Sequence, residues 1–100
     1  MALQRFGFIV KGAGYDPDRH TARIESSQMM TTVIGISAPE QALLVAKQMV
    51  ADGVQLIELC GGFGPILTAR VIEAIGGAVP VGSVGYGPES IAQMHELFAS

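Results

Sequence analysis

The stretch Val54-Gln55-Leu56-Ile57-Glu58-Leu59-Cys60-Gly61-Gly62-Phe63-Gly64-Pro65 decides the fold class of this chain. Its first half is nearly continuous in apolar character, which is typical of a strand buried on both faces in a parallel sheet covered by helices. Its second half contains three glycines and then a proline, the residue favoured at the first position of a helix. The stretch therefore predicts a buried strand, a tight turn and a helix.

Similar patterns extend along the chain in both directions. Runs of apolar and β-branched residues predict strands, and apolar residues at a 3.6-residue spacing predict helices. Ser37 and Glu40 predict a capping box at the start of the first helix, and Gly53 predicts its end. The predicted strands cover residues 6–10, 30–36, 54–59 and 79–84, and the predicted helices cover residues 37–52, 65–75 and 89–98.

The alternation of these elements predicts one α/β domain over residues 1–100, in the order ββαβαβα. Strands that alternate with helices are typical of right-handed parallel crossovers. We expect a layered sandwich with a mostly parallel sheet of about four strands and about three helices, in a reduced flavodoxin-like or half-barrel arrangement. Two points stay open. Residues 21–28 are ambiguous, with an alternation that would suit a half-exposed edge segment, and the direction of the first strand is not determined.

Apolar residues make up 49% of the chain, and charged residues make up only 15%. A domain of this size buries only about 60–65% of the surface of its unfolded chain, so part of the apolar surface is expected to lie against another copy. We predict a homo-oligomer, most simply a two-fold dimer.

Charge and cysteine content argue against several classes of function. The net charge is −3 and the six basic residues are scattered, which disfavours binding to nucleic acid or to an anionic membrane. The single cysteine permits no internal disulfide, and no histidine or cysteine spacing indicates a metal site, which fits a cytoplasmic protein. No apolar run approaches the roughly 18 residues of a membrane span, and no dinucleotide or P-loop fingerprint is present.

Three loops are expected at the carboxyl ends of strands, where parallel sheets bind their ligands: residues 11–20, 60–65 and 83–88. The last two loops each carry glycine, an aromatic residue, glycine and proline before a helix. Free amides at two helix N-termini would favour a phosphate or carboxylate between them, which predicts a pocket for a small anionic metabolite. Alternatively, each loop only makes a sharp turn. The candidate ligand-binding residues are Lys11, Arg19, Gly61, Gly62, Phe63, Gly64, Ser83, Gly85, Tyr86 and Gly87.

Three side chains are candidates for catalysis. Glu58 is an acid in an apolar strand, so it either transfers protons at the site or lies on an exposed face. Cys60 precedes a helix N-terminus, so it is either a nucleophile or a small buried apolar residue. His20 is either a general acid or base or part of a solvated loop.

Several motifs of this chain resemble a family of small bacterial proteins of about this length that is catalogued as a domain of unknown function. The resemblance covers nearly the whole chain and implies a bacterial cytoplasmic protein, but it supplies no activity. The motifs that carry it are Phe8-Ile9-Val10, Gly14-Tyr15-Asp16-Pro17 with His20, Glu58-Leu59-Cys60-Gly61-Gly62-Phe63-Gly64-Pro65 and Val79-Pro80-Val81-Gly82.

Two functions remain open. The first is a small oligomeric enzyme acting on a phosphorylated or carboxylated metabolite, with Glu58 and His20 transferring protons and Cys60 as a nucleophile. The second is a non-catalytic module that binds such a metabolite in the same pocket. Clustering of the three side chains favours the enzyme. A separation of more than about 15 Å between His20 and an exposed Glu58, beyond the reach of general acid–base catalysis, favours the module.

Overall fold

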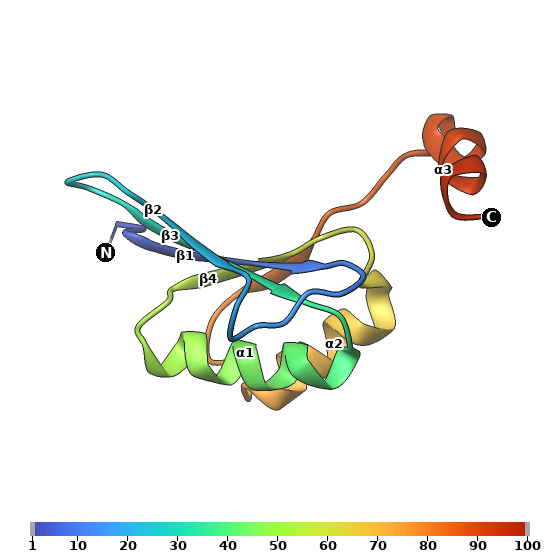
Figure 1. Ribbon diagram of the computed structural model, residues 1–100. Helices are drawn as coiled ribbons and strands as arrows, with labels where there is room; N and C mark the ends of the chain where they lie inside the picture. Colours follow the sequence, from blue (N-terminus) through green and yellow to red (C-terminus); the bar gives the residue numbers. More distant parts are fainter. Residues whose placement is uncertain (1, 100) are drawn as a thin grey trace.

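Five strands form one sheet, and two helices pack against one of its faces (Figure 1). The computed structural model describes residues 2–99. In chain order the elements are β1 (Arg5–Lys11), β2 (Thr21–Glu25), β3 (Met30–Ile36), α1 (Pro39–Ala51), β4 (Leu56–Leu59), α2 (Gly64–Ala74), β5 (Val81–Ser83), the short 3₁₀ helix η1 (Pro88–Ser90) and α3 (Ile91–Phe98).

The sheet has the strand order β2-β3-β1-β4-β5. The central strand β1 is parallel to both of its neighbours, with Phe8 beside Val33 of β3 and beside Glu58 of β4. β5 is parallel to β4, whereas β2 is antiparallel to β3. The predicted α/β fold with a mostly parallel sheet is therefore confirmed, and the direction of the first strand is settled.

The predicted strand number and the order ββαβαβα are wrong, because the ambiguous segment contains a strand. Residues Thr21–Glu25 form β2, which pairs with β3 as an edge strand. All five of its residues are exposed. The polar–apolar alternation in this segment covers only Arg23, Ile24 and Glu25, so the sequence left it ambiguous, and its pairing with β3 identifies it as a strand.

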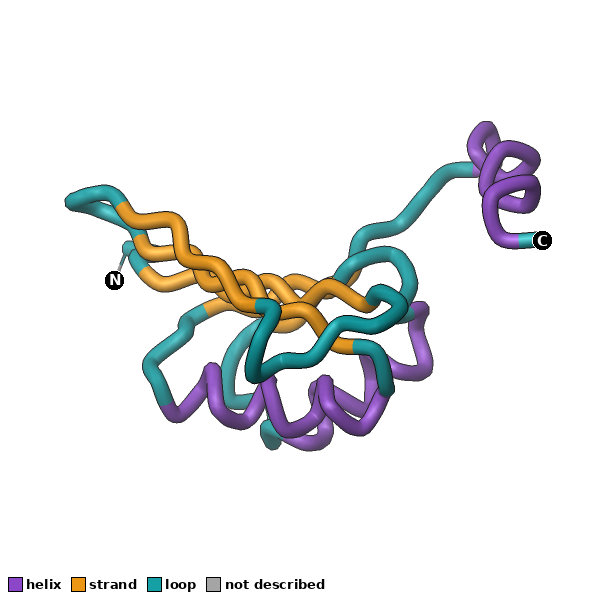
Figure 2. The backbone as a smooth tube through the Cα atoms, viewed as in Figure 1, coloured by secondary structure: helices purple, strands orange, loops and turns teal. Residues whose placement is uncertain are grey.

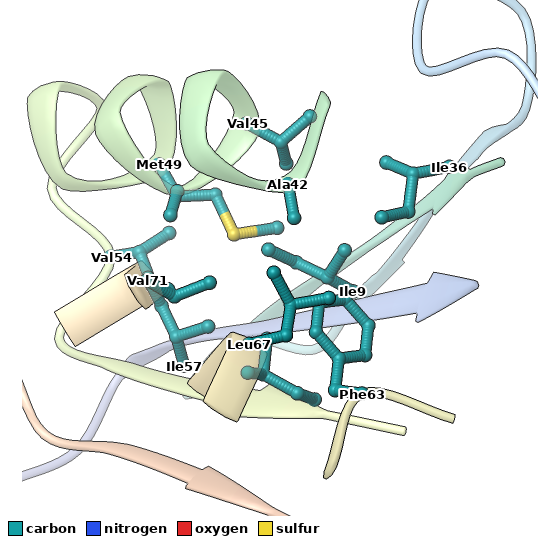
Figure 3. Close-up of a cluster of buried hydrophobic side chains, with 12 residues drawn as sticks. Ile9, Ile36, Ala42, Val45, Met49, Val54, Ile57, Phe63, Leu67 and Val71 are labelled. Carbon is teal, nitrogen blue, oxygen red and sulfur yellow. The ribbon is translucent and has the colours of Figure 1, made fainter. Parts of the chain in front are cut away.

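The hydrophobic core lies between the sheet and the two helices α1 and α2 (Figures 2 and 3). Ile9 and Ile57 are fully buried and point from the sheet toward the helices, which contribute residues such as Ala46 and Val71. The buried core consists of Ile9, Ile36, Ala42, Val45, Ala46, Met49, Val54, Ile57, Leu59, Phe63, Leu67 and Val71.

The opposite face of the sheet is not covered by α1 or α2 (Figure 1). Parallel crossovers are right-handed, and α1 (from β3 to β4) and α2 (from β4 to β5) step across the sheet in the same direction, so both lie on the same face. The connection from β1 to β3 steps in the other direction, but it contains a loop and β2 and no helix, so no helix is placed on the other face. We call this surface the open face; by alternation it presents Phe6, Phe8, Val10, Ala22, Ile24, Thr31, Val33, Gly35, Leu56, Glu58 and Gly82.

The expectation that β4 is buried on both faces is therefore wrong for the single chain. Ile57 and Leu59 are buried under the helices, but Leu56 is only half-buried and Glu58 is exposed. The continuous apolar pattern needs a second cover that α1 and α2 do not provide.

The start of α1 also differs from the prediction by one residue. Pro39 is the first helical residue, so Ala38 is the N-cap, and the side chain at the third helical position is that of Gln41. Its Oε1 accepts hydrogen bonds from the amides of Ser37 (2.9 Å) and Ala38 (3.0 Å). The predicted Ser37–Glu40 box fails because proline occupies the first helical position, as it prefers to do. The predicted stop at Gly53 is confirmed by its φ of 92°.

Truncating the core should be costly, and truncating an exposed isoleucine should not. Ile57 is fully buried, whereas Ile66 on α2 is 80% exposed. We expect Ile57→Ala to lower the free energy of unfolding by about 3 kcal/mol, since it removes buried methyl groups and leaves a cavity. Ile66→Ala removes the same atoms and should change it by less than about 0.5 kcal/mol. Urea unfolding followed by circular dichroism measures both, and equal losses would contradict the assigned core.

Candidate functional site

The loops that follow β1, β4 and β5 meet at the carboxyl edge of the sheet, as the sequence predicted. The amide of Lys11 donates to Cys60 Sγ at 3.2 Å. The ring of Tyr86 lies against Gly61, where an added Cβ would come within 2.7 Å of it. Lys11, Cys60, Gly61 and Tyr86 are therefore neighbours in space.

The geometry of the Cys60–Gly64 turn explains two of its glycines without a ligand. Gly61 must lack a side chain because Tyr86 packs against it, and Gly64 has a φ of 68°, which favours glycine. Phe63 is buried in the core and its amide donates to the carbonyl of Cys60 at 3.1 Å. Only Gly62 is exposed with room for a side chain. Packing thus accounts for most of this motif.

Cys60 and Glu58 occupy different environments. Cys60 is half-buried, packs against the core and accepts the Lys11 amide through its sulfur. Glu58 is exposed on the open face beside Phe8, and within residues 2–99 it takes part in no ion pair. These contacts favour a packing role for the thiol and leave the carboxylate free in solvent.

The Ser83–Pro88 loop does not repeat the arrangement of the first glycine turn. Gly87 leads into the 3₁₀ helix η1 instead of directly into an α-helix, and the carboxylate of Glu89 lies where a Cβ on Gly87 would be. This carboxylate already supplies a negative charge at the start of the helical segment, where an external anion would have to bind. The helix that follows, α3, has no buried residue and stands apart from the sheet (Figure 1).

The first loop folds tightly around Asp16 and His20. The Asp16 amide donates to His20 Nδ1 at 2.8 Å, and the Asp16 carboxylate accepts from the Asp18 amide at 2.9 Å. Because Nδ1 accepts, a neutral His20 ring carries its proton on Nε2. The rings of Tyr15 and His20 lie 5.4 Å apart between centroids. The loop therefore holds the imidazole in one orientation beside an aromatic ring.

Tyr15 lies over the end of the open face because two glycines make room for its ring. A Cβ added to Gly35 of β3 would come within 2.9 Å of the ring, and one added to Gly12 would come within 2.6 Å. A hollow of about 360 Å³ lies beside this ring and has an apolar floor formed by the strands. Its lining consists of Val10, Tyr15, Arg19, His20, Thr21, Ala22, Val33 and Gly35. We call it the Tyr15 hollow.

The structure does not bring the three catalytic candidates together. The Gly35 amide donates to the His20 carbonyl, so His20 continues the line of β2. β2 and β4 are three strand spacings apart in the sheet. Along the strands, Gly35 pairs with Val10, which lies two residues beyond Phe8, the partner of Glu58. Standard strand geometry then separates the backbones of His20 and Glu58 by about 16 Å.

The described residues contain no group of three or more histidine, cysteine or acidic side chains that could hold a metal ion. No helix within residues 2–99 is long and apolar enough to cross a membrane. Residues 4–99 match the model of a family of unknown function. The chain belongs to this family, DUF6506. No curated protein and no solved structure matches the chain.

In this member of DUF6506, the sequence identified Arg19 and His20 but missed the other residues that line the Tyr15 hollow. Tyr15 was part of a family motif without a role, and Gly35 was one residue of a β-branched strand. A glycine inside a strand often marks a close approach of another group, so Gly35 was the available signal. Its partner could not be identified, because Tyr15 lies 20 positions away in a loop.

Substitution by alanine should destabilise the protein at Gly64 but not at Gly62 of the glycine turn. Gly64→Ala places a side chain at a positive φ and should lower the free energy of unfolding by about 1 kcal/mol. Gly62→Ala is the matched control, because its φ is not positive and its Cβ would meet its nearest atom only at 3.7 Å. Urea unfolding measures both, and an equal or larger loss for Gly62→Ala would contradict the turn geometry.

The position of Tyr15 can be tested through the glycine beneath it. Gly35→Ala should displace the Tyr15 ring and change its NMR chemical shifts and its contacts with Val33 or Val10, because the added methyl group overlaps the ring. Gly82→Ala adds the same methyl group to the same face of the sheet with nothing within 4 Å, so it should leave Tyr15 unchanged. Unaltered Tyr15 resonances in Gly35→Ala would show that the ring does not cover β3.

Proposed function

We propose that this protein is a non-catalytic binding module for a small organic anion with an apolar or aromatic part, and that the ligand binds in the Tyr15 hollow. The observation that carries the proposal is the combination of an apolar strand floor, an aromatic wall and basic groups around one hollow of about 360 Å³. Small-molecule sites are typically of this size and composition, with few polar groups that orient the ligand.

Arg19 is the residue that would hold the anionic group. Its guanidinium makes no ion pair within the described part of the chain, and it can donate two parallel hydrogen bonds to a carboxylate or phosphate. His20 adds an Nε2–H donor and Thr21 a hydroxyl on the same rim. Of the two acids in the loop, Asp16 accepts the Asp18 amide through its carboxylate, and neither Asp16 nor Asp18 lines the hollow.

A binding role is favoured over catalysis because His20 lies at the end of β2, apart from Glu58 and Cys60 at the end of β4. General acid–base catalysis needs the two groups within hydrogen-bond reach of the same substrate. His20 and Glu58 are about 16 Å apart by strand geometry, and Cys60 is occupied by the Lys11 amide and the core. We therefore propose that the anion binds at the first loop and not at the glycine turns that the sequence predicted. A bacterial cytoplasmic protein, as the family resemblance implies, remains part of this proposal.

Two probe anions, benzoate and phenyl phosphate, can test the site. Each should shift the amide resonances of Tyr15, His20 and Val33 and bind with a dissociation constant of about 1 mM, which is typical of the modest energy available to a fragment of this size. Benzyl alcohol, which has the ring without the charge, should bind more weakly. Two-dimensional NMR titration of the labelled protein measures both the affinity and the residues affected.

Two charge variants distinguish the two candidate sites. Arg19→Gln should weaken binding of phenyl phosphate at least about tenfold, as expected for the loss of a charge-assisted bidentate contact. Lys11→Gln removes a positive charge beside the glycine turn and should leave the affinity unchanged. Loss of binding in Lys11→Gln, with shifts at Gly61 and Gly62, would move the site to the glycine turn. No shift with either probe would refute the proposal.

A further inference from the structure

Two apolar surfaces of this chain lack a cover. The first is the open face, on which Glu58 is the sole charged residue among those assigned to it. The second is α3, where Ile91 is 64% exposed, Leu97 74% and Phe98 77%. Together with Met94 these side chains form one stripe along the helix, and Ala92 and Glu96 lie on the other side. A solvated stripe of this kind is typical of a helix that packs against a partner.

The exposed area is larger than a compact monomer of this size should have. The accessible surface is 6546 Å² for a mass of 10.4 kDa, whereas folded monomers of that mass expose roughly 5,400 Å². The excess of roughly 1,100 Å² is somewhat more than the roughly 800 Å² per partner that a standard stable interface buries. The radius of gyration of 14.1 Å likewise exceeds the roughly 13 Å expected for 100 residues. Association with one further copy would account for this excess.

We propose that two copies exchange their C-terminal helices, so that α3 of each copy packs with its apolar stripe on the open face of the other. The contact is two-fold symmetric, because the same two surfaces are used in both directions. In each copy α3 covers the part of the open face formed by Phe6, Phe8, Thr31 and Leu56. The Tyr15 hollow, at the end of the face near Val10 and Gly35, stays uncovered.

The path of the linker favours a second copy over the helix's own sheet. The Val84 amide donates to the Leu59 carbonyl at 2.9 Å, which extends the pairing of β5 with β4 by one residue, and the Tyr86 ring is held against Gly61. Gly87 then has an extended ψ of 170°, which proline at the next position favours. The chain therefore runs away from the sheet before α3 begins, as Figures 1 and 2 show. For α3 to pack on the open face of its own chain, the backbone would have to reverse direction within residues 84–87, which these contacts hold extended.

The two surfaces also match in size and charge. A helix of eight residues is about 12 Å long, and it can lie across the central strands of the open face, which are spaced about 4.8 Å apart. His95 borders the apolar stripe and is the basic residue of α3, so it can approach Glu58, the acid of the open face. The exchange also supplies the second cover that the continuous apolar sequence of β4 requires.

A charge placed within the stripe tests the proposal in the full chain. The unmodified protein should sediment as a dimer at protein concentrations of roughly 20–50 µM, because the proposed interface is of the standard size for a stable complex. Phe98→Glu should weaken the dimer about 100-fold or more, because the substitution places a charge in both symmetric contacts. Ala92→Glu adds the same charge to the opposite side of α3 and should remain dimeric. Since α3 contributes no buried residue, both variants should keep the circular dichroism spectrum of the folded domain.

A mixing experiment determines which copy receives the helix. In a Cys60→Ala background, one chain carries Thr31→Cys on the open face and a second chain carries Leu97→Cys on α3. Mixing them with a short bis-maleimide should give a covalent dimer of the two different chains. The same two substitutions placed in one chain should then also give mainly cross-linked dimers. A cross-link confined to single chains would show that α3 folds onto its own sheet and would overturn the proposal.

The proposal is also overturned if the unmodified protein is monomeric, or if Phe98→Glu leaves the dimer intact. Both measurements are made without any ligand, so their outcome is independent of the binding function proposed for the Tyr15 hollow. Arg19→Gln, which is designed to weaken anion binding, should leave the dimer unchanged, because Arg19 lies on the rim of that hollow.

Discussion

The right-handedness of parallel crossovers is the constraint on which this structure depends. Both helical crossovers, through α1 and α2, step in the same direction across the sheet and are therefore forced onto the same face. The core, with Ile9 and Ile57 fully buried, forms on that face only. The open face and its exposed Glu58 follow from this one-sided arrangement.

The same arrangement decides which loop borders open space above the strands. The Cys60–Gly64 turn leads into α2 on the covered side, and its Phe63, Gly61 and Gly64 are used for packing and chain reversal. The first loop instead lies beside the open face, where no helix fills the space above the strands. Tyr15 occupies part of that space and leaves the adjoining hollow accessible. The hollow beside the first loop is thus lined by the polar side chains of Arg19, His20 and Thr21.

The elements with a strong local signal were predicted closely. The predicted strand 30–36 has the bounds of β3, and the stop of α1 at Gly53 follows from the positive φ that glycine tolerates. β2 was left ambiguous because its polar–apolar alternation is limited to Arg23, Ile24 and Glu25 and none of its residues is buried. At the candidate site, Arg19 and His20 could be identified from their chemistry, whereas the contact between Tyr15 and Gly35 joins residues from a loop and a strand that only the folded chain brings together.

The sequence by itself determined the α/β class, the mostly parallel sheet and the gathering of three loops at one edge, because these follow from local periodicity and from the turn chemistry of glycine and proline. Tertiary structure alone decided the strand order, the face that stays open and the separation of His20 from Glu58. These depend on the direction of each crossover and on which strands become neighbours, and no local pattern of side chains encodes either property.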